Sequence, residues 1–140
     1  MPFNALIPEL AVQSCSEALA FYRDVLGFTV AYQRPEEGFA FLEFGDAQLM
    51  LDEIGEGRTF EVAGPLSRPL GRGLNLQIRV DSVLPLLASL ELATWSLYLP
   101  LEEKWYRRDD QELGNRQFVV ADPDGYLLRF FEPLGTRPAS

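Results

Sequence analysis

One order of elements, a strand, a helix and three further strands, is predicted twice along this chain of 140 residues. In the first copy, apolar and polar residues alternate over residues 4–12, as they do in a half-buried strand. Ser14 and Glu17 have the spacing of a capping box, and a helical apolar pattern then runs as far as Gly27. The remaining predicted strands of this copy cover residues 28–33, 39–44 and 48–53.

The second copy follows residues 54–73, a segment that holds five of the eleven glycines and is interpreted as a linker. Alternation over residues 74–80 predicts a strand, and the helix after it covers about residues 82–91, with Pro85 in its first turn. The later segments are predicted as strands at 95–99, 117–121 and 126–132, a long polar loop at 100–115 and a turn at 122–125.

The duplication predicts an α+β fold. We expect two tandem β-α-β-β-β modules, residues 4–53 and 74–133, that form curved sheets around a shared cavity. The length fits a single domain over residues 1–140. Because each sheet packs one face on its helix, the other face remains available to line the cavity.

Charge and composition narrow the possible partners. Twelve Lys and Arg against 21 Asp and Glu give a net charge of −9, which repels nucleic acid and permits a cationic ligand, although acidity also serves solubility. No run of residues reaches the length of a membrane span, so we expect no membrane partner and a cytoplasmic location. A lone Cys15 and the absence of histidine exclude a disulfide framework and Ser-His-Asp chemistry.

Two stretches carry a family resemblance. The run ALAFYRDVLGF at residues 18–28 resembles the first helix, and its exit, of the vicinal oxygen chelate superfamily. The run DPDGYLLRF at residues 122–130 resembles the last hairpin of that superfamily, which contains glyoxalase I, extradiol dioxygenases and bleomycin resistance proteins. The resemblance implies the duplicated fold over essentially the whole chain, while the chemistry of the superfamily varies widely on this scaffold.

Enzymes of this superfamily hold a divalent metal with four side chains, on the first and last strands of each half. The resemblance places those positions at Ile7, Asp52, Asn75 and Arg129. Asp52 is the one good ligand among them, and Glu9 shares a face with Ile7, but a guanidinium repels a cation. We therefore expect no metal cofactor. We hypothesise instead an ion pair of Arg129 with Asp52, with Asn75 nearby, that either joins the two halves or grips a ligand.

Loss of the metal ligands resembles the bleomycin resistance branch, whose members bind their drug stoichiometrically and do not modify it. The resemblance implies a metal-free homodimer that sequesters a cationic, partly aromatic small molecule at its interface. One departure is the segment at residues 112–117, which lacks the tryptophan that this branch usually places there.

Aromatic and polar side chains supply the candidate ligand contacts. Trp105 and Tyr106 lie in the predicted acidic loop, where an exposed ring suits stacking, and Trp105 is the first candidate unless it anchors the loop. Phe39 and Phe41 share one face of a predicted strand and line either the cavity or the core. The full set of candidates is Trp105, Tyr106, Phe39, Phe41, Asp52, Asn75, Arg129 and Glu9.

Two other functions remain open at this point. A metalloenzyme similar to glyoxalase I or an extradiol dioxygenase is disfavoured by the lack of histidine and by Arg129. A binding module for an unrelated metabolite is compatible with every residue considered above.

Overall fold

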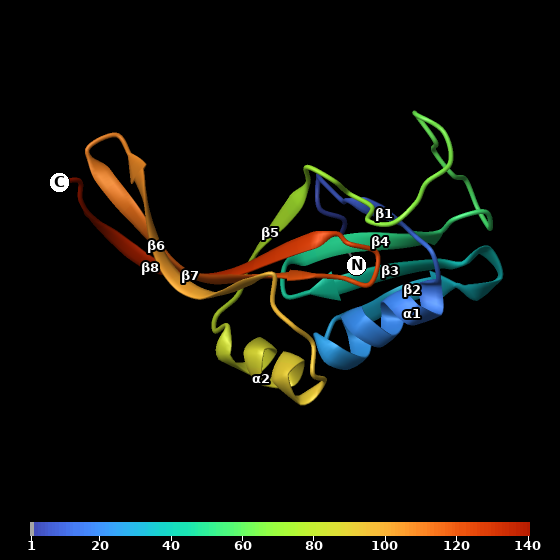
Figure 1. Ribbon diagram of the computed structural model, residues 1–140, viewed down its shortest axis with the longest axis horizontal. Coiled ribbons are helices and arrows are strands. Elements are labelled where there is room, and N and C mark those ends of the chain that lie inside the picture. Colours follow the sequence, from blue (N-terminus) through green and yellow to red (C-terminus); the bar gives the residue numbers. More distant parts are fainter. Residues whose placement is uncertain (1) are drawn as a thin grey trace. The chain divides into compact units, whose positions relative to one another are not determined.

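The computed structural model describes residues 2–140 and contains two four-stranded sheets, each accompanied by a helix (Figure 1). The chain divides into two compact units. Unit 1 comprises Met1–Arg72 with Asp122–Tyr126, and unit 2 comprises Gly73–Ala121 with Leu127–Ser140. Across residues 2–140, no helix has the length and apolar character needed to cross a membrane. The α+β class and the duplicated order of elements are confirmed, whereas a cavity shared by the two modules stays a prediction.

Unit 1 holds the first sheet, with strand order β1-β4-β3-β2. Strand β1 runs parallel to β4, and the other neighbours are antiparallel. Its elements are β1 (Glu9–Val12), α1 (Cys15–Leu19), the π-helix η1 (Ala20–Val25), β2 (Thr29–Arg34), the short 3-10 helix η2 (Pro35–Glu37), β3 (Phe39–Phe44) and β4 (Ala47–Glu53). The expected first strand is shorter than predicted, since β1 begins only after Pro8, which has no amide hydrogen to donate to a ladder.

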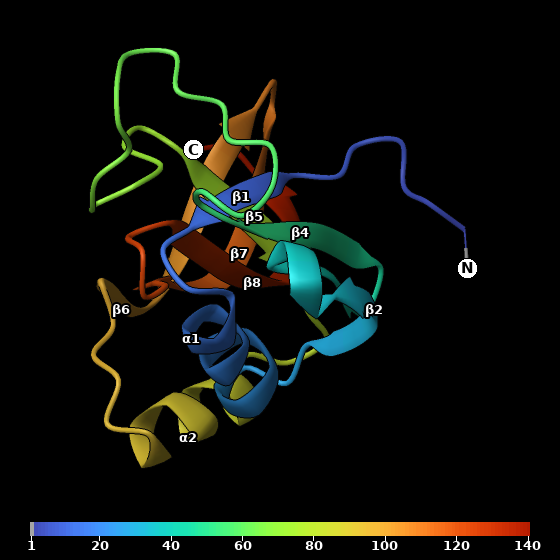
Figure 2. The same cartoon turned by 90° about the vertical axis from the view of Figure 1, so that its right-hand side faces the viewer.

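The helical segment of unit 1 begins where the capping spacing predicts. The Ser14 side chain accepts a hydrogen bond from the Glu17 amide at 3.2 Å. The segment lies on one side of the sheet, and residues 54–72 loop out on the opposite side (Figures 1 and 2). Alternate residues of β1, β3 and β4 pack toward the helical side, and six of them are almost fully buried: Leu10, Val12, Ala40, Leu42, Leu49 and Leu51.

The predicted turn at residues 122–125 is part of unit 1, although it joins two strands of unit 2. The buried Asp122 accepts hydrogen bonds from the Tyr22 hydroxyl at 2.6 Å and from the amides of Asp124 and Tyr126 at 2.9 Å each. The Tyr126 hydroxyl donates to the Ala11 carbonyl at 2.9 Å. These bonds anchor the turn to α1–η1 and to β1.

Unit 2 holds the second sheet, with strand order β5-β8-β7-β6 and β5 parallel to β8. Its elements are β5 (Asn75–Arg79), α2 (Leu84–Leu92), β6 (Leu99–Arg108), β7 (Gln111–Ala121) and β8 (Leu127–Pro138). Helix α2 lies against one side of this sheet (Figure 1). The buried apolar residues of this unit include Ile78, Val83, Leu86, Leu90, Phe118, Val120, Leu128 and Phe130.

The predicted strand at 95–99 and loop at 100–115 are wrong. Strand β6 starts at Leu99, and β6 and β7 form a long hairpin that turns at Asp109, whose φ is 59°. Polar residues occupy both faces of β6, so no apolar alternation marks it in the sequence. Its ladder is accompanied by a cross-strand contact of Glu103 with Arg116 at 3.5 Å. Strand β8 likewise continues beyond the predicted end at residue 132.

Candidate ligand-binding site

The sheet face of unit 1 that points away from α1 carries aromatic and charged side chains. The strand register puts Tyr32 beside Phe41, and Arg34 beside Phe39. The rings of Tyr32 and Phe41 stack with centroids 5.1 Å apart, and the Arg34 guanidinium lies 4.0 Å from the centre of the Phe39 ring. Phe39 and Phe41 are only 5% and 1% exposed, so both rings are packed within the fold. A ligand contact for them stays a prediction.

Two acidic groups share this face. Glu9 on β1 and Asp52 on β4 lie on adjacent parallel strands, two register steps apart. Partial burial and the carboxylate of Asp52 raise the pKa of Glu9, and burial also raises the pKa of Asp52. Arg34 opposes both shifts without cancelling either. The pair is therefore a concentration of negative charge that the protein compensates incompletely.

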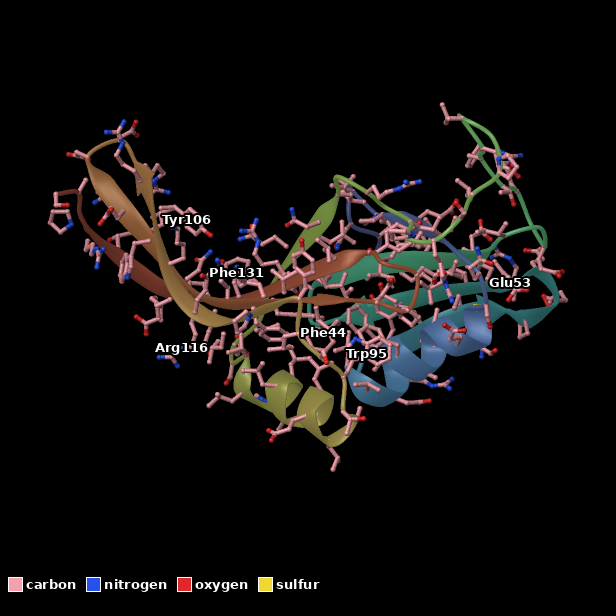
Figure 3. All side chains as sticks on the ribbon, in the orientation of Figure 1. Phe44, Glu53, Trp95, Tyr106, Arg116 and Phe131 are labelled. Atoms are coloured by element: carbon pink, nitrogen blue, oxygen red, sulfur yellow. The ribbon has the colours of Figure 1, made fainter. Side chains whose placement is uncertain are left out.

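The sheet face of unit 2 that points away from α2 contains a cavity of about 280 Å³. Residues of all four strands of the sheet line it, together with one residue just before β6. They are Asn75, Tyr98, Leu99, Glu102, Tyr106, Gln117, Val119, Leu127 and Arg129. Figure 3 shows Tyr106 and Phe131 on this face and Arg116 on the side of α2. The register agrees, because Phe131 pairs with Gln117 and Arg116 pairs with Glu103.

A hydrogen-bonded network crosses the cavity. Gln117, 1% exposed, donates through Nε2 to Glu102 Oε2 at 2.8 Å and to the Tyr106 hydroxyl at 2.7 Å. Arg129 donates through Nη1 to the same hydroxyl at 3.4 Å, a long bond. The Nε atom of Arg129 is buried and has no hydrogen-bond partner. The guanidinium is thus the least satisfied group of the network.

The structure brings three predicted residues together in the cavity of unit 2: Asn75, Tyr106 and Arg129. Trp105 lies on the opposite face, because consecutive residues of a strand point to opposite sides. Its ring packs on Gly114 and under the Arg137 guanidinium, 4.1 Å from the ring centre. The role of Trp105 in binding stays a prediction, on a face that the cavity does not use.

Sequence reasoning missed Gln117 and Glu102. Gln117 stands at the start of the apolar run QFVV, and a lone polar residue on a buried strand is a signal that needs a partner. Glu102 carried no such signal, since its strand was interpreted as a loop. The hypothesised pair of Arg129 with Asp52 joins residues of different units and stays a prediction.

The paired registers also make the two copies directly comparable. Glu9 pairs with Met50 in unit 1 as Asn75 pairs with Leu127 in unit 2. Asp52 and Arg129 each follow two residues later, so Glu9 and Asp52 have the same register relation as Asn75 and Arg129. The assignment of Ile7 to the superfamily's metal site stays a prediction.

The residues at these positions do not fit a divalent metal. Arg129 brings a positive charge and no free lone pair to the position that the resemblance assigns to a metal ligand. Throughout residues 2–140, no group of three or more His, Cys, Asp or Glu side chains is arranged to hold a metal ion.

Comparison with known proteins gives the same fold and a consistent sequence relationship. Residues 5–63 match the model of the Glyoxalase/Bleomycin resistance protein/Dioxygenase superfamily. A bleomycin resistance protein of Geobacillus stearothermophilus is 27% identical over 135 residues, which cover 91% of this chain and 96% of the relative.

Two solved structures show the fold. TioX from Micromonospora sp. ML1 matches with a TM-score of 0.71 and 24% identity, over 94% of this chain and 100% of that one. A bleomycin resistance determinant encoded on the transposon Tn5 matches with a TM-score of 0.61 and 20% identity, over 93% of this chain and 98% of that one. Residues 5–63 are thus similar in sequence to this superfamily, and the chain as a whole shares the fold of the two solved structures.

Proposed function

We propose that this chain is a metal-free binding protein that sequesters a cationic, partly aromatic small molecule and leaves it chemically unchanged. Bleomycin-type compounds are the model ligand, because the curated relatives that match along the chain are bleomycin resistance proteins. The observation that carries the proposal is the acidic pair Glu9 and Asp52, which shares a sheet face with aromatic rings.

The chemistry of that face suits a cation. Both carboxyl groups have raised pKa values, which means that their ionised forms lack full compensation. A cationic group bound beside them would supply the missing charge and lower both pKa values. Tyr32, 38% exposed and stacked on Phe41, offers a ring edge for the aromatic part of the ligand.

The absence of chemical conversion rests on Arg129. The metal-dependent members of the superfamily need a ligand at its position, and a guanidinium cannot serve. A metalloenzyme is the competing function, and tight binding of nickel, zinc or ferrous iron by the purified protein would favour it. The family resemblance also leads us to propose a homodimer. Light scattering coupled to size-exclusion chromatography tests this by measuring the molar mass of the protein in solution.

The proposal is tested by titration calorimetry of chelator-treated protein with metal-free bleomycin, at low and at high salt. We expect saturable binding at about one ligand per chain, weakened by salt because charges attract the ligand. Glu9→Gln and Asp52→Asn should each weaken binding about two- to fivefold, as partly exposed charge contacts do. Glu91→Gln, on α2 in unit 2, changes the net charge equally and should bind as the parent does. No saturable heat at low salt refutes the drug assignment.

A further inference from the structure

We propose that the cavity of unit 2 binds the carboxylate of a small acid, with Arg129 as the counter-charge in place of the metal ion used by metal-dependent relatives. This inference goes beyond the proposed function, since it involves neither the acidic pair of unit 1 nor a cationic drug.

Several hydrogen-bond donors of Arg129 have no acceptor within unit 2. A guanidinium carries five N–H groups, and within unit 2 a single long bond to the Tyr106 hydroxyl engages it. No carboxylate of unit 2 forms an ion pair with it. Its buried Nε lacks an acceptor, which is costly for a charged donor. Because only one long bond restrains the side chain, it can turn its Nε edge toward a carboxylate and form the parallel two-bond contact that guanidinium groups favour.

The neighbouring groups leave further donors on the same side. The Tyr106 hydroxyl accepts from both Gln117 and Arg129, so its own proton is free to be donated to a ligand. Both amide protons of Gln117 are used within the network. Glu102, the acid of this cavity, already receives one of them. The unused hydrogen-bonding groups of the cavity are therefore mainly donors, which favours a ligand with acceptor atoms over a cationic ligand.

The remaining walls accommodate an apolar body. Tyr98, Leu99, Val119 and Leu127 line the cavity beside Arg129. A volume of about 280 Å³ lies at the small end of ligand pockets, which suits an acid with one ring. An aromatic carboxylate is thus the class of ligand that satisfies both the apolar wall and the guanidinium.

The experiment is an NMR titration of the isotope-labelled full chain with benzoate, with neutral benzamide and with cationic benzamidine. Benzoate should bind saturably, shift the resonances of cavity residues and bind more tightly than the two other probes. Arg129→Gln should weaken benzoate binding about 10- to 100-fold, as loss of a charge-assisted contact does. Arg107→Gln removes the same charge from the opposite face of β6 and should leave binding unchanged.

A second variant protects the test against misfolding of Arg129→Gln. Tyr106→Phe keeps the ring and removes the hydroxyl donor, and we expect it to weaken benzoate binding severalfold while the rest of the spectrum is preserved. The proposal is overturned if benzamidine binds better than benzoate, because Glu102 would then govern the cavity, or if neither variant affects benzoate. Failure of benzoate with retained bleomycin binding would overturn this inference alone, and the reverse result would overturn the drug assignment alone.

Discussion

Asp122 is a buried carboxyl group whose surroundings stabilise its ionised form poorly. Replacing it by asparagine measures how much this group contributes to the pH dependence of the unfolding free energy. Burial raises its pKa from 3.8 to about 6, despite hydrogen bonds from the Tyr22 hydroxyl and two backbone amides. Between these two pH values the folded protein holds a proton that the unfolded chain has released. The stability that Asp122 contributes is therefore present below pH 4 and is lost as the pH rises through 6.

The size of the effect follows from the shift. About two pKa units correspond to about 3 kcal/mol of unfolding free energy lost between pH 4 and pH 7. In Asp122→Asn the side-chain oxygen still accepts from the two amides, and the new NH₂ group faces the Tyr22 oxygen. The variant should lack this component of the pH dependence. Relative to the parent, it should gain about 3 kcal/mol on going from pH 4 to pH 7.

Urea unfolding followed by far-ultraviolet circular dichroism at pH 4, 5, 6 and 7 gives both curves. Tyr22→Phe provides a signed control, because it removes a hydrogen bond that lowers the pKa of Asp122 and should steepen the loss of stability with pH. Asp110→Asn, in the exposed turn between β6 and β7, should follow the parent curve. Parallel curves for the parent and Asp122→Asn would show that the buried carboxyl does not set this dependence.

Three further predictions concern packing and capping. Gly114→Ala should destabilise the fold by about 1–3 kcal/mol in urea unfolding, because an added Cβ would lie 2.7 Å from the Trp105 ring; an unchanged midpoint would contradict that packing. Trp105→Ala should lower the unfolding midpoint but leave benzoate affinity unchanged, since its ring lies on the face opposite the cavity; weaker binding would place Trp105 in the site. Ser14→Ala should cost about 1 kcal/mol by removing the acceptor for the Glu17 amide, and Ser14→Asp, which keeps an acceptor, should restore it.

Local signals were enough to predict most of unit 1. The bounds of β3 (Phe39–Phe44) agree with the prediction because apolar residues of both faces are bracketed by Gly38 and Gly45. The start of α1 follows from the hydrogen bond between Ser14 and Glu17, which involves only neighbours in sequence. The β6–β7 hairpin was missed for the opposite reason. An edge strand with polar residues on both faces leaves no periodic pattern, and its register depends on partners far along the chain.

The same error affected the candidate site. Trp105 and Tyr106 are proposed together as exposed rings of one acidic loop, whereas a strand points them to opposite faces. Tyr106 consequently lines the cavity with Asn75 and Arg129, and Trp105 packs on Gly114. The sequence alone identified both aromatic residues as candidates. That they point to opposite faces follows only from their place on the strand β6.

The duplicated architecture explains how one chain can carry one sheet face suited to a cationic ligand and another suited to an anionic ligand. Positions with the same register relation hold Glu9 and Asp52 in unit 1, and Asn75 and Arg129 in unit 2. Each change alters charge at a position whose backbone is fixed by the parallel pairing of β1 with β4 or of β5 with β8. The copies can therefore diverge in ligand preference without disturbing the ladders that hold them. Reversing one charge, as in Arg129→Glu, should consequently shift unit 2 from benzoate toward benzamidine while the β-sheet signature in circular dichroism is retained; loss of both ligands together with loss of that signature would show that Arg129 supports the fold instead.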